Sequence, residues 1–454
     1  MRTTSWAAFG TLEASVLLSS TGNGITMVAF PWLVLQETGS PTAAATIAAV
    51  ATLPLVVSML FSGAIIDMVG RRPVAVVSDL LSMGSVLAVP ALAAATELNV
   101  LLLGAVALLG AVFDPAGLTA REAMLPEAAA RAGLRLERAN GIHESAFGFA
   151  FLLGPGIGGL LISWFGAVHT FWATGIAFAV SAVLIGISPT PGSGRPAAHE
   201  RPKGLLSATG AGLRYLWADQ VLRESSILFA ALILVWLPIE SVILPVYFNG
   251  IDEPAQLGFL ITAMSGGGVV GALLYAAVGP RISRRTAFVS SLVLCAVPVL
   301  GMSLLPPYPW MIVLGVLTGL FFGSVNPIIN LAIQHRTTND MRGRVNGIYG
   351  SVANVAGPLG YLIAGPLITA IDVERAFQVM AVLVFIASAS AVFMGSLRRL
   401  DDPPIPGSAA SDELLHLEVT GAHLDVRTIG VDTPQSPAVP DHPPTPEPPV
   451  PGGR

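Results

Sequence analysis

The chain has 454 residues, of which 53% are hydrophobic and only 11% are charged. A soluble domain carries about 25% charged residues, so this composition excludes a typical soluble globular protein. The net charge of −5 comes from the segment after Leu400, and the rest of the chain has no strongly basic patch for nucleic acid. Cys295 is the only cysteine, which excludes a disulfide framework and a cysteine-based metal site.

Apolar runs of about 20 residues, the length that a bilayer requires, recur between short charged breaks. Helix is the expected structure, because a backbone in lipid must form its own hydrogen bonds and the runs lack the alternation of a membrane barrel. The first run is too long for the apolar core of a signal peptide. Twelve membrane-spanning helices are predicted over residues 7–36, 42–66, 74–95, 99–120, 141–164, 168–189, 225–248, 256–279, 286–305, 309–333, 346–370 and 376–397.

The basic residues predict the orientation of these helices. If the N-terminus is cytoplasmic, Arg375 is the only one of the 23 Lys and Arg residues in an outward loop. The positive-inside rule therefore predicts a multi-pass protein of the cell membrane with both termini in the cytoplasm. Lys203 is the only lysine, and together with abundant Ala, Gly and Pro it indicates a bacterial genome of high GC content.

The predicted helices fall into two groups of six. A polar segment at 190–224, expected to be a cytoplasmic middle loop, separates residues 1–189 from 225–400. Asn-Gly-Ile opens the fifth span at Asn140 and the eleventh at Asn346, which indicates an internal repeat. The predicted fold is an all-α membrane protein with twelve transmembrane helices in two pseudo-symmetric six-helix halves, a common transporter plan with the substrate site between the halves.

The last segment, 401–454, holds twelve prolines, nine acidic residues and two arginines. Such a composition buries too little apolar surface to fold alone, so a disordered, Pro-rich acidic tail is predicted.

The most specific pattern joins the second and third spans: Gly63-Ala-Ile-Ile-Asp67-Met-Val-Gly70-Arg71-Arg72. A tight turn needs a glycine such as Gly70, and a carboxylate at the end of a span needs a donor or a cation. The pattern resembles the signature G-x-x-x-D-x-x-G-R-[RK] of the major facilitator superfamily at every position, and the wider resemblance covers about residues 5–400. It implies a cytoplasmic latch in which Asp67 meets the eleventh span near 345–346 and the arginines pair with Asp114 or Glu122.

A second pattern lies in the fifth span, Leu153-Gly154-Pro155-Gly156-Ile157-Gly158-Gly159. Gly154 and Gly158 share a helix face, which lets another backbone approach closely, and Pro155 favours a bend. The pattern resembles the G-P-x-x-G-G motif of drug:proton antiporters, and the glycines at 266–271 are its expected partners. Residues 30–40 and 113–141 resemble the macrolide-efflux branch, whereas the R-x-x-x-Q-G motif of many drug exporters is absent.

Five acidic residues lie within the predicted spans. A carboxylate at bilayer depth is costly and is a functional candidate, and desolvation favours its protonated form, as a proton carrier requires. Glu240, which is the deepest by sequence, and Glu13 are the predicted proton-coupling or cation-binding residues, with a hydrogen-bonded structural acid as the alternative. Asp79, Asp114 and Glu144 lie nearer the inner surface and are assigned structural roles in the latch network.

Polar and aromatic residues within the spans are candidates for a substrate cavity, although Trp also anchors helices at membrane interfaces. His143 adjoins Glu144 and is interpreted as a cytoplasmic polar contact. The chain shows no Walker phosphate loop, metal-spaced His cluster or nucleophile elbow, so neither an enzyme nor an ATP-driven pump is expected. The cavity candidates are Asn23, Trp32, Trp236, Asn326 and Asn330.

These patterns predict a monomeric transporter that exports a small lipophilic compound in exchange for protons, by alternating access in a lipid bilayer. The proton gradient is its energy source, and no cofactor or metal is expected. An importer of the same fold, an exporter of one metabolite such as a siderophore, and a non-transporting scaffold whose tail recruits a partner are the alternatives.

Replacing Asp67 tests the latch. Asp67→Asn should reduce transport by a factor on the order of ten, because hydrogen bonds to charged groups contribute roughly 1.5–3 kcal/mol, and it should leave membrane insertion intact. Transport and insertion are compared in the same membranes. Wild-type turnover in a well-inserted variant would contradict the latch.

Overall fold

The computed structural model describes residues 5–190 and 205–403. Every element in these two ranges is helical, and the ranges contain no strand. The predicted tail lies outside the described residues from 404 onward. The all-α prediction is therefore confirmed for the part of the chain that the structure describes.

The first six helices follow one another with short connections. Ser40 Oγ accepts a hydrogen bond from the backbone N–H of Ala43 at the start of the second helix, and Asn99 caps the fourth in the same way. Gly39 and Gly133 end the first and fourth in the left-handed conformation that glycine adopts most readily. The helices are α1 (Ala7–Thr38), α2 (Pro41–Val69), α3 (Arg71–Ala95), α4 (Val100–Ala132), α5 (Leu136–Phe165) and α6 (Ala167–Ile187).

The remaining elements include two interrupted spans. A π-helical turn divides the segment predicted at 225–248, and a break after Phe322 divides the one predicted at 309–333. The elements are α7 (Leu205–Ala218), α8 (Gln220–Pro238), η1 (Ile239–Ile243), α9 (Leu244–Gly250), α10 (Pro254–Val278), η2 (Gly279–Arg281), α11 (Arg284–Ser303), α12 (Tyr308–Phe322), α13 (Val325–Arg336), α14 (Asn339–Ile371), α15 (Val373–Phe393) and η3 (Gly395–Asp401).

Ten segments within the described residues are long and apolar enough to cross a membrane. They comprise α3 to α6, the continuous α8–η1–α9 segment, α10, α11, the α12–α13 segment, α14 and α15. Helices α1 and α2, with 32 and 29 residues, are outside these ten. The predicted count of twelve spans therefore remains a prediction.

The largest differences from the predicted boundaries occur at two places. Helix α4 continues to Ala132 rather than ending near residue 120, and α7 occupies part of the segment predicted to be a loop at 190–224. Apolar periodicity under-predicts such helices because a charged helix end outside the apolar run looks like a loop. The longer α4 places several charged side chains on a helix that also carries apolar residues.

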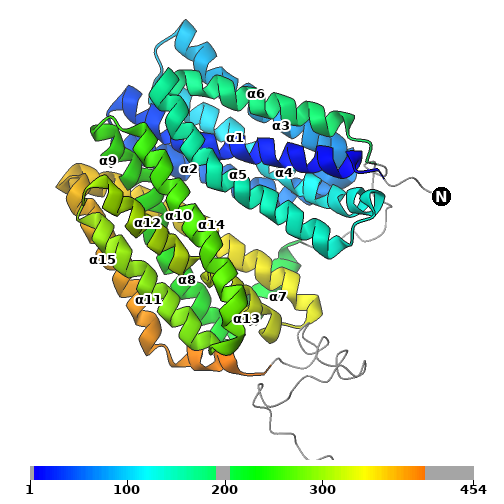
Figure 1. The fold of residues 1–454 in the computed structure, drawn as a ribbon, viewed down its shortest axis with the longest axis vertical. Coiled ribbons are helices and arrows are strands. Elements are labelled where there is room, and N and C mark those ends of the chain that lie inside the picture. Colours follow the sequence, from blue (N-terminus) through cyan, green and yellow to red (C-terminus); the bar gives the residue numbers. More distant parts are fainter. Residues whose placement is uncertain (1–4, 191–204, 404–454) are drawn as a thin grey trace, which may run out of the picture.

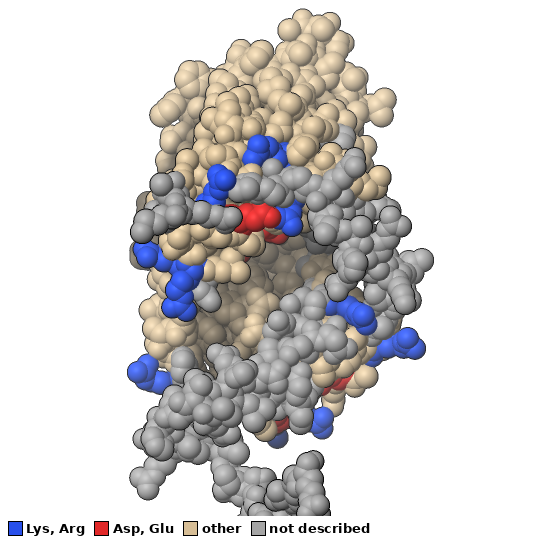
Figure 2. Space-filling model, turned by 90° about the vertical axis from the view of Figure 1, so that its right-hand side faces the viewer, with Lys and Arg blue, Asp and Glu red and all other residues tan. Residues whose placement is uncertain are grey.

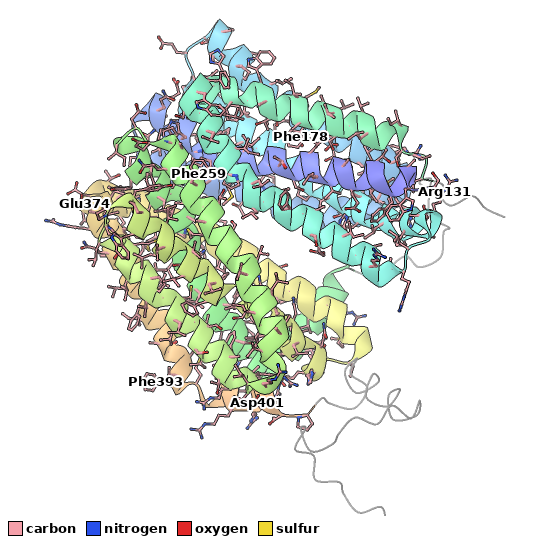
Figure 3. The ribbon with its side chains drawn as sticks, viewed as in Figure 1. Arg131, Phe178, Phe259, Glu374, Phe393 and Asp401 are labelled. Carbon is pink, nitrogen blue, oxygen red and sulfur yellow. The ribbon has the colours of Figure 1, made fainter. Side chains whose placement is uncertain are left out.

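Helices α1–α6 lie together in one part of the molecule and α8–α15 in another (Figure 1). We call the end at which α1 begins and α2 meets α3 the Gly70 end, and the opposite end, where α1 meets α2, the Gly39 end. Figure 3 labels Arg131 at the Gly70 end and Glu374 at the Gly39 end. The two groups of helices diverge towards the Gly70 end (Figure 1).

Close contacts join the two groups at the Gly39 end. Helix α5 packs along α10, and α2 packs along α14. The hydroxyl groups of Thr42 and Thr369 lie 3.1 Å apart, and a Cβ on Gly365 would come within 2.9 Å of the Thr42 Cα. Small residues therefore permit backbone-to-backbone packing at this end.

The glycine pattern of α5 packs on two helices. A Cβ on Gly154 would lie 2.7 Å from the Cα of Gly24 in α1, and one on Gly159 would lie 3.1 Å from the Cα of Gly258 in α10. Of the expected partner glycines on α10, Gly267 and Gly271 face the α12 backbone instead, whereas Gly266 meets the Leu152 side chain of α5. The close backbone approach predicted for the glycine motif is present, with α1 as one partner helix and α10 as the other.

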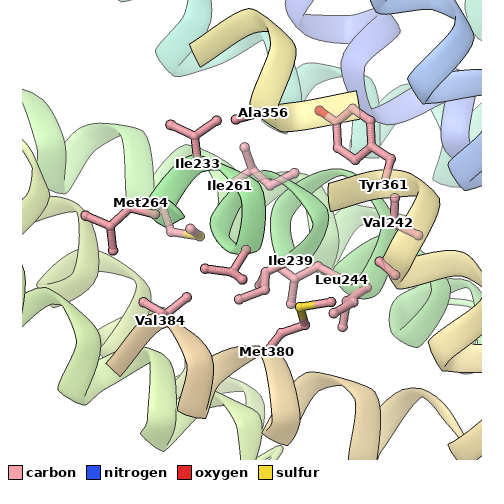
Figure 4. Packing of buried hydrophobic residues seen from close by; sticks show 14 of the residues in the cluster. Ile233, Ile239, Val242, Leu244, Ile261, Met264, Ala356, Tyr361, Met380 and Val384 are labelled. Carbon is pink, nitrogen blue, oxygen red and sulfur yellow. The ribbon is translucent and has the colours of Figure 1, made fainter. Parts of the chain in front are cut away.

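Buried apolar side chains fill the centre of the second group around the interrupted α8–η1–α9 segment (Figure 4). Ile239 and Leu244 on this segment are buried, and so are Met380 and Val384 of α15. Tyr361 of α14 points its hydroxyl towards the first group in the same view. The packed core holds the irregular turn at η1 against both groups of helices.

The close approach of α5 and α1 can be tested with matched glycines. Gly154→Ala should lower the free energy of unfolding by about 1–3 kcal/mol, because the added methyl overpacks the contact with Gly24. Gly148→Ala, on the same helix, is the control, since a Cβ there meets nothing within 4 Å. Thermal unfolding of the purified protein in detergent measures both, and equal midpoints would contradict the packing.

Candidate functional site

A cavity of about 330 Å³ lies among the first six helices. Its wall comes from α1, α2, α3, α4 and α6, and the second group adds Ser241 of η1 and Tyr361 of α14. The lining is mostly apolar and includes the rings of Phe30, Phe171 and Phe178. A cavity of this size and character suits a small ligand with a large apolar surface.

One carboxylate enters this apolar wall. Asn23 Nδ2 donates a hydrogen bond of 2.7 Å to Asp114 Oδ2, and among the described residues that line the cavity Asp114 is the only formally charged one. Asn23 therefore lies where the sequence predicts a cavity residue. Asp114 was assigned to the latch by resemblance, but the structure places it in the cavity wall instead.

A smaller cavity of about 80 Å³ adjoins the first. Asn23 and Asp114 line both cavities. The remaining wall is Ser19, Ser20 and Arg121 with the apolar residues Val16, Leu118, Phe147 and Phe151. The Asn23–Asp114 pair thus stands between a mainly apolar space and a more polar one.

Behind the smaller cavity lies a buried ion pair that the sequence analysis missed. Arg121 of α4 pairs with Asp79 of α3, and these residues are only 2% and 1% exposed. Arg121 Nε also donates to Ser15 Oγ at 3.2 Å, and the Ser181 hydroxyl lies 2.7 Å from Asp79 Oδ2. Ser19 Oγ donates to Asp79 Oδ1 at 3.2 Å, so α1, α3, α4 and α6 all contribute.

Arg121 was missed because the fourth span was predicted to end near residue 120. An arginine just beyond a span is normally an anchor in the cytoplasm, whereas α4 continues for 11 residues to Ala132, about three turns. The available signal was Asp79, an acid inside a span that requires a buried partner.

Glu13 of α1 meets His143 of α5. Glu13 Oε1 lies 3.2 Å from His143 Nδ1, and the two residues are 9% and 5% exposed. His143, which was interpreted as a cytoplasmic polar contact, thus makes a polar contact with Glu13, but the packing of α1 on α5 buries it. Glu144, the next residue, is exposed.

Glu240 lies in the π-helical turn η1, between α8 and α9. Its carboxylate accepts a hydrogen bond from the Trp236 indole, one turn earlier. The neighbouring residue Ser241 lines the large cavity and lies 3.5 Å from the Tyr361 hydroxyl. Single π-turns often occur at functional sites. Glu240 itself lines neither cavity, although it is one residue from Ser241.

The other predicted cavity residues lie elsewhere. Trp32 is buried in the core and 2% exposed, and Trp236 stacks on Phe322 with ring centroids 5.7 Å apart. Asn326 and Asn330 are exposed and four residues apart on α13. None of these four residues is part of either cavity wall. The sequence indicates which face of its own helix a residue occupies, but not which other helix that face meets.

The loop between α2 and α3 makes contacts of its own. Gly70 adopts a φ of 107°, as the glycine requirement predicts. Arg71 Nη1 pairs with Glu127 Oε1 at 2.9 Å, and Arg72 Nη2 donates to the Thr190 carbonyl at 2.6 Å. The implied partners Asp114 and Glu122 are thus replaced by another acid of α4. The side chain of Asp67 and the surroundings of Gly63 lie outside the described residues.

The surface at the Gly70 end is hollowed between the two groups of helices, with Lys, Arg, Asp and Glu side chains around the hollow (Figure 2). The described residues contain no group of three or more His, Cys, Asp or Glu that could hold a metal ion. A hollow at one end, close packing at the other and an apolar cavity between helices define a membrane transporter.

The chain belongs to the transmembrane secretion effector family of the major facilitator superfamily, whose model matches residues 4–423. The resemblance inferred from the loop between the second and third spans is therefore confirmed.

Characterised relatives are transporters. The multidrug efflux pump Tap of Mycolicibacterium fortuitum is 42% identical over 390 residues, which cover 85% of this chain and 95% of that protein. Tap of Mycobacterium tuberculosis is 41% identical over 393 residues, with 86% and 94% covered. Macrolide efflux protein A of Streptococcus pyogenes is 21% identical over 408 residues, with 87% and 97% covered.

Solved structures show the same fold. A mutant of the nucleoside transporter NupG matches with a TM-score of 0.71 at 12% identity, covering 86% of this chain and all of that one. NupG itself matches with a TM-score of 0.67 at 13% identity, with 85% and 98% covered.

The buried ion pair predicts a large and specific loss of stability. Asp79→Ala should lower the free energy of unfolding by about 3–5 kcal/mol, because it leaves the Arg121 guanidinium buried without its counter-ion. Asp79→Leu combined with Arg121→Met should recover most of that loss, because both charges are then removed. Thermal unfolding in detergent gives the two values.

The matched control is Glu127→Ala. It breaks the Arg71–Glu127 pair, whose side chains are 24% and 35% exposed, and such pairs contribute about 0–1 kcal/mol. If the protein with both Asp79→Leu and Arg121→Met were as unstable as Asp79→Ala alone, that result would contradict the assignment of a buried ion pair.

Proposed function

We propose that this protein exports a small lipophilic compound from a bacterial cell in exchange for protons, by alternating access. The observation that carries the proposal is the apolar cavity of about 330 Å³ with the Asn23–Asp114 pair in its wall. A mainly apolar lining favours lipophilic compounds, and one carboxylate and one amide orient their polar groups. The names of the relatives, multidrug and macrolide efflux proteins, support export as the direction.

The proposed architecture is twelve transmembrane helices in two pseudo-symmetric halves. Adding α1 and α2, which exceed the roughly 20 residues needed to span a bilayer, to the ten candidate segments gives this number. The Gly70 end is assigned to the cytoplasm together with both termini, because Arg71, Arg72 and Arg131 lie there. In this assignment the hollow in Figure 2 opens to the cytoplasm, and a single chain forms the whole path as a monomer.

The proposed energy source is the proton gradient, without a cofactor. Glu13 and Glu240 are the proposed proton-coupling carboxylates, since each is an acid within the helical bundle with one polar partner among the described residues, His143 or Trp236. Protonation removes a charge from an apolar environment, and so changes the relative free energies of two packings of the helices. The loop arginines and Asp67 stabilise the state that is closed to the cytoplasm.

Accumulation in cells that lack their own exporters tests the function. Expression of the protein should lower the accumulation of ethidium and erythromycin several-fold, and a protonophore should abolish the difference, because export needs the gradient. Glu240→Gln and Glu13→Gln, expressed to the same level, should resemble cells treated with the protonophore.

The control is the same plasmid with Glu374→Gln, which changes an exposed acid at the start of α15. Export that continues in the presence of protonophore would contradict proton coupling. Higher accumulation on expression would indicate import instead.

A further inference from the structure

The helix faces that line the smaller cavity continue to a buried pair of titratable side chains. On α1, Glu13 comes three residues before Val16 and seven before Ser20, which both line the cavity. On α5, His143 comes four residues before Phe147, which also lines it. These spacings place each set on one face of its helix. The Glu13–His143 pair therefore lies at the Gly70 end of the cavity wall.

The pair is incompletely satisfied. Glu13 Oε1 contacts His143 Nδ1 at 3.2 Å, but Glu13 Oε2 is buried and has no hydrogen-bond partner in the described part of the chain. An ionised carboxylate that is buried with one oxygen unpaired is costly. The free oxygen therefore lacks the hydrogen bond that would offset this cost.

Further acidic side chains lie near the pair. Glu122 of α4 and Glu144 of α5 both interact electrostatically with His143. Helices α6 and α10, which also pack on α5, carry no Asp, Glu, Lys or Arg. The nearest described cation in the adjoining cavity wall is Arg121, which is already neutralised by Asp79.

The wall of the smaller cavity begins about one helical turn from this pair, at Val16 and Phe147, and the cavity can hold water. Its volume of about 80 Å³ is several times the roughly 15 Å³ that one water requires. Ser19, Ser20 and Asn23 line it with polar groups, and Asp114 lies at its junction with the large cavity. Water in a polar cavity of this size conducts protons by exchanging hydrogen bonds.

We propose that Glu13 and His143 form one proton-binding site, and that the smaller cavity carries protons between this site and Asp114. The proton leaves the Asp114 carboxyl group for a water molecule and is taken up at Glu13 and His143. It is then released at the Gly70 end, and no other bond changes. This inference rests on the proposed proton-driven export, and it makes His143 a functional residue.

The first test uses the purified full chain in detergent, with the proton itself as the probe. Nuclear magnetic resonance of ring-nitrogen-labelled histidine follows His143, which is assigned by the loss of its signal in His143→Gln or, should that variant not fold, His143→Asn. The His143 signal should change with pH, and Glu13→Gln should alter that pH dependence, because it removes the partner of the imidazole. His169→Gln is the matched control, since His169 is exposed on α6 at the Gly39 end.

The second test separates proton coupling from folding. In liposomes, His143→Gln should lose about tenfold or more of erythromycin movement driven by an imposed pH gradient, as loss of a titrating group requires. Counterflow of erythromycin without a gradient should stay close to wild type, because binding and the movement of the helices remain.

The outcomes distinguish the two proposals. A His143 signal that is constant across the pH range, or a His143→Gln protein that keeps gradient-driven movement, would overturn the proton site. A folded His143→Gln protein that loses gradient-driven movement and counterflow equally would also overturn the proton site, because the role of His143 would then be structural. A wild-type protein that moves no erythromycin under the gradient would count against the proposed function, while a titration coupled to Glu13 would still support the site.

Discussion

Burial of charge in an apolar bundle is the constraint on which the first six helices depend. Arg121 and Asp79 are both almost fully buried, and an ionised group in such surroundings requires a counter-ion and hydrogen bonds for its remaining polar atoms. Serines from α1 and α6 supply those bonds. The network therefore holds four helices in one arrangement, and that arrangement leaves the two cavities between them.

Glycines set the second constraint, which is how closely helix backbones approach. Gly154 and Gly158 allow α5 to lie against α1, while Gly159 allows the same helix to lie against α10. One helix thus connects the wall of the cavity to the other group of helices at the Gly39 end. Close packing there and a hollow at the Gly70 end (Figure 2) are the geometry expected of one of the two states in the proposed alternating-access cycle.

The acids of the bundle differ in their surroundings, and this difference separates their roles. Asp79 is fully paired and holds the structure together, whereas Asp114 has one amide as its hydrogen-bond partner among the described residues and faces the cavity. Glu13 has one oxygen without a partner in the same described ranges. A carboxylate that changes protonation during a cycle must be stable in both states, which favours partial over complete pairing.

The sequence by itself determined the helical class, the approximate spans, the superfamily and the glycine turn at Gly70, because these follow from local composition and from short motifs whose spacing fixes the backbone. Only the tertiary structure showed that Arg121 meets Asp79, that Glu127 pairs with Arg71, and that His143 is buried against Glu13. Periodicity assigns a side chain to a face of its own helix. Which helix covers that face depends on contacts between residues far apart in the chain, and these contacts have no local signal.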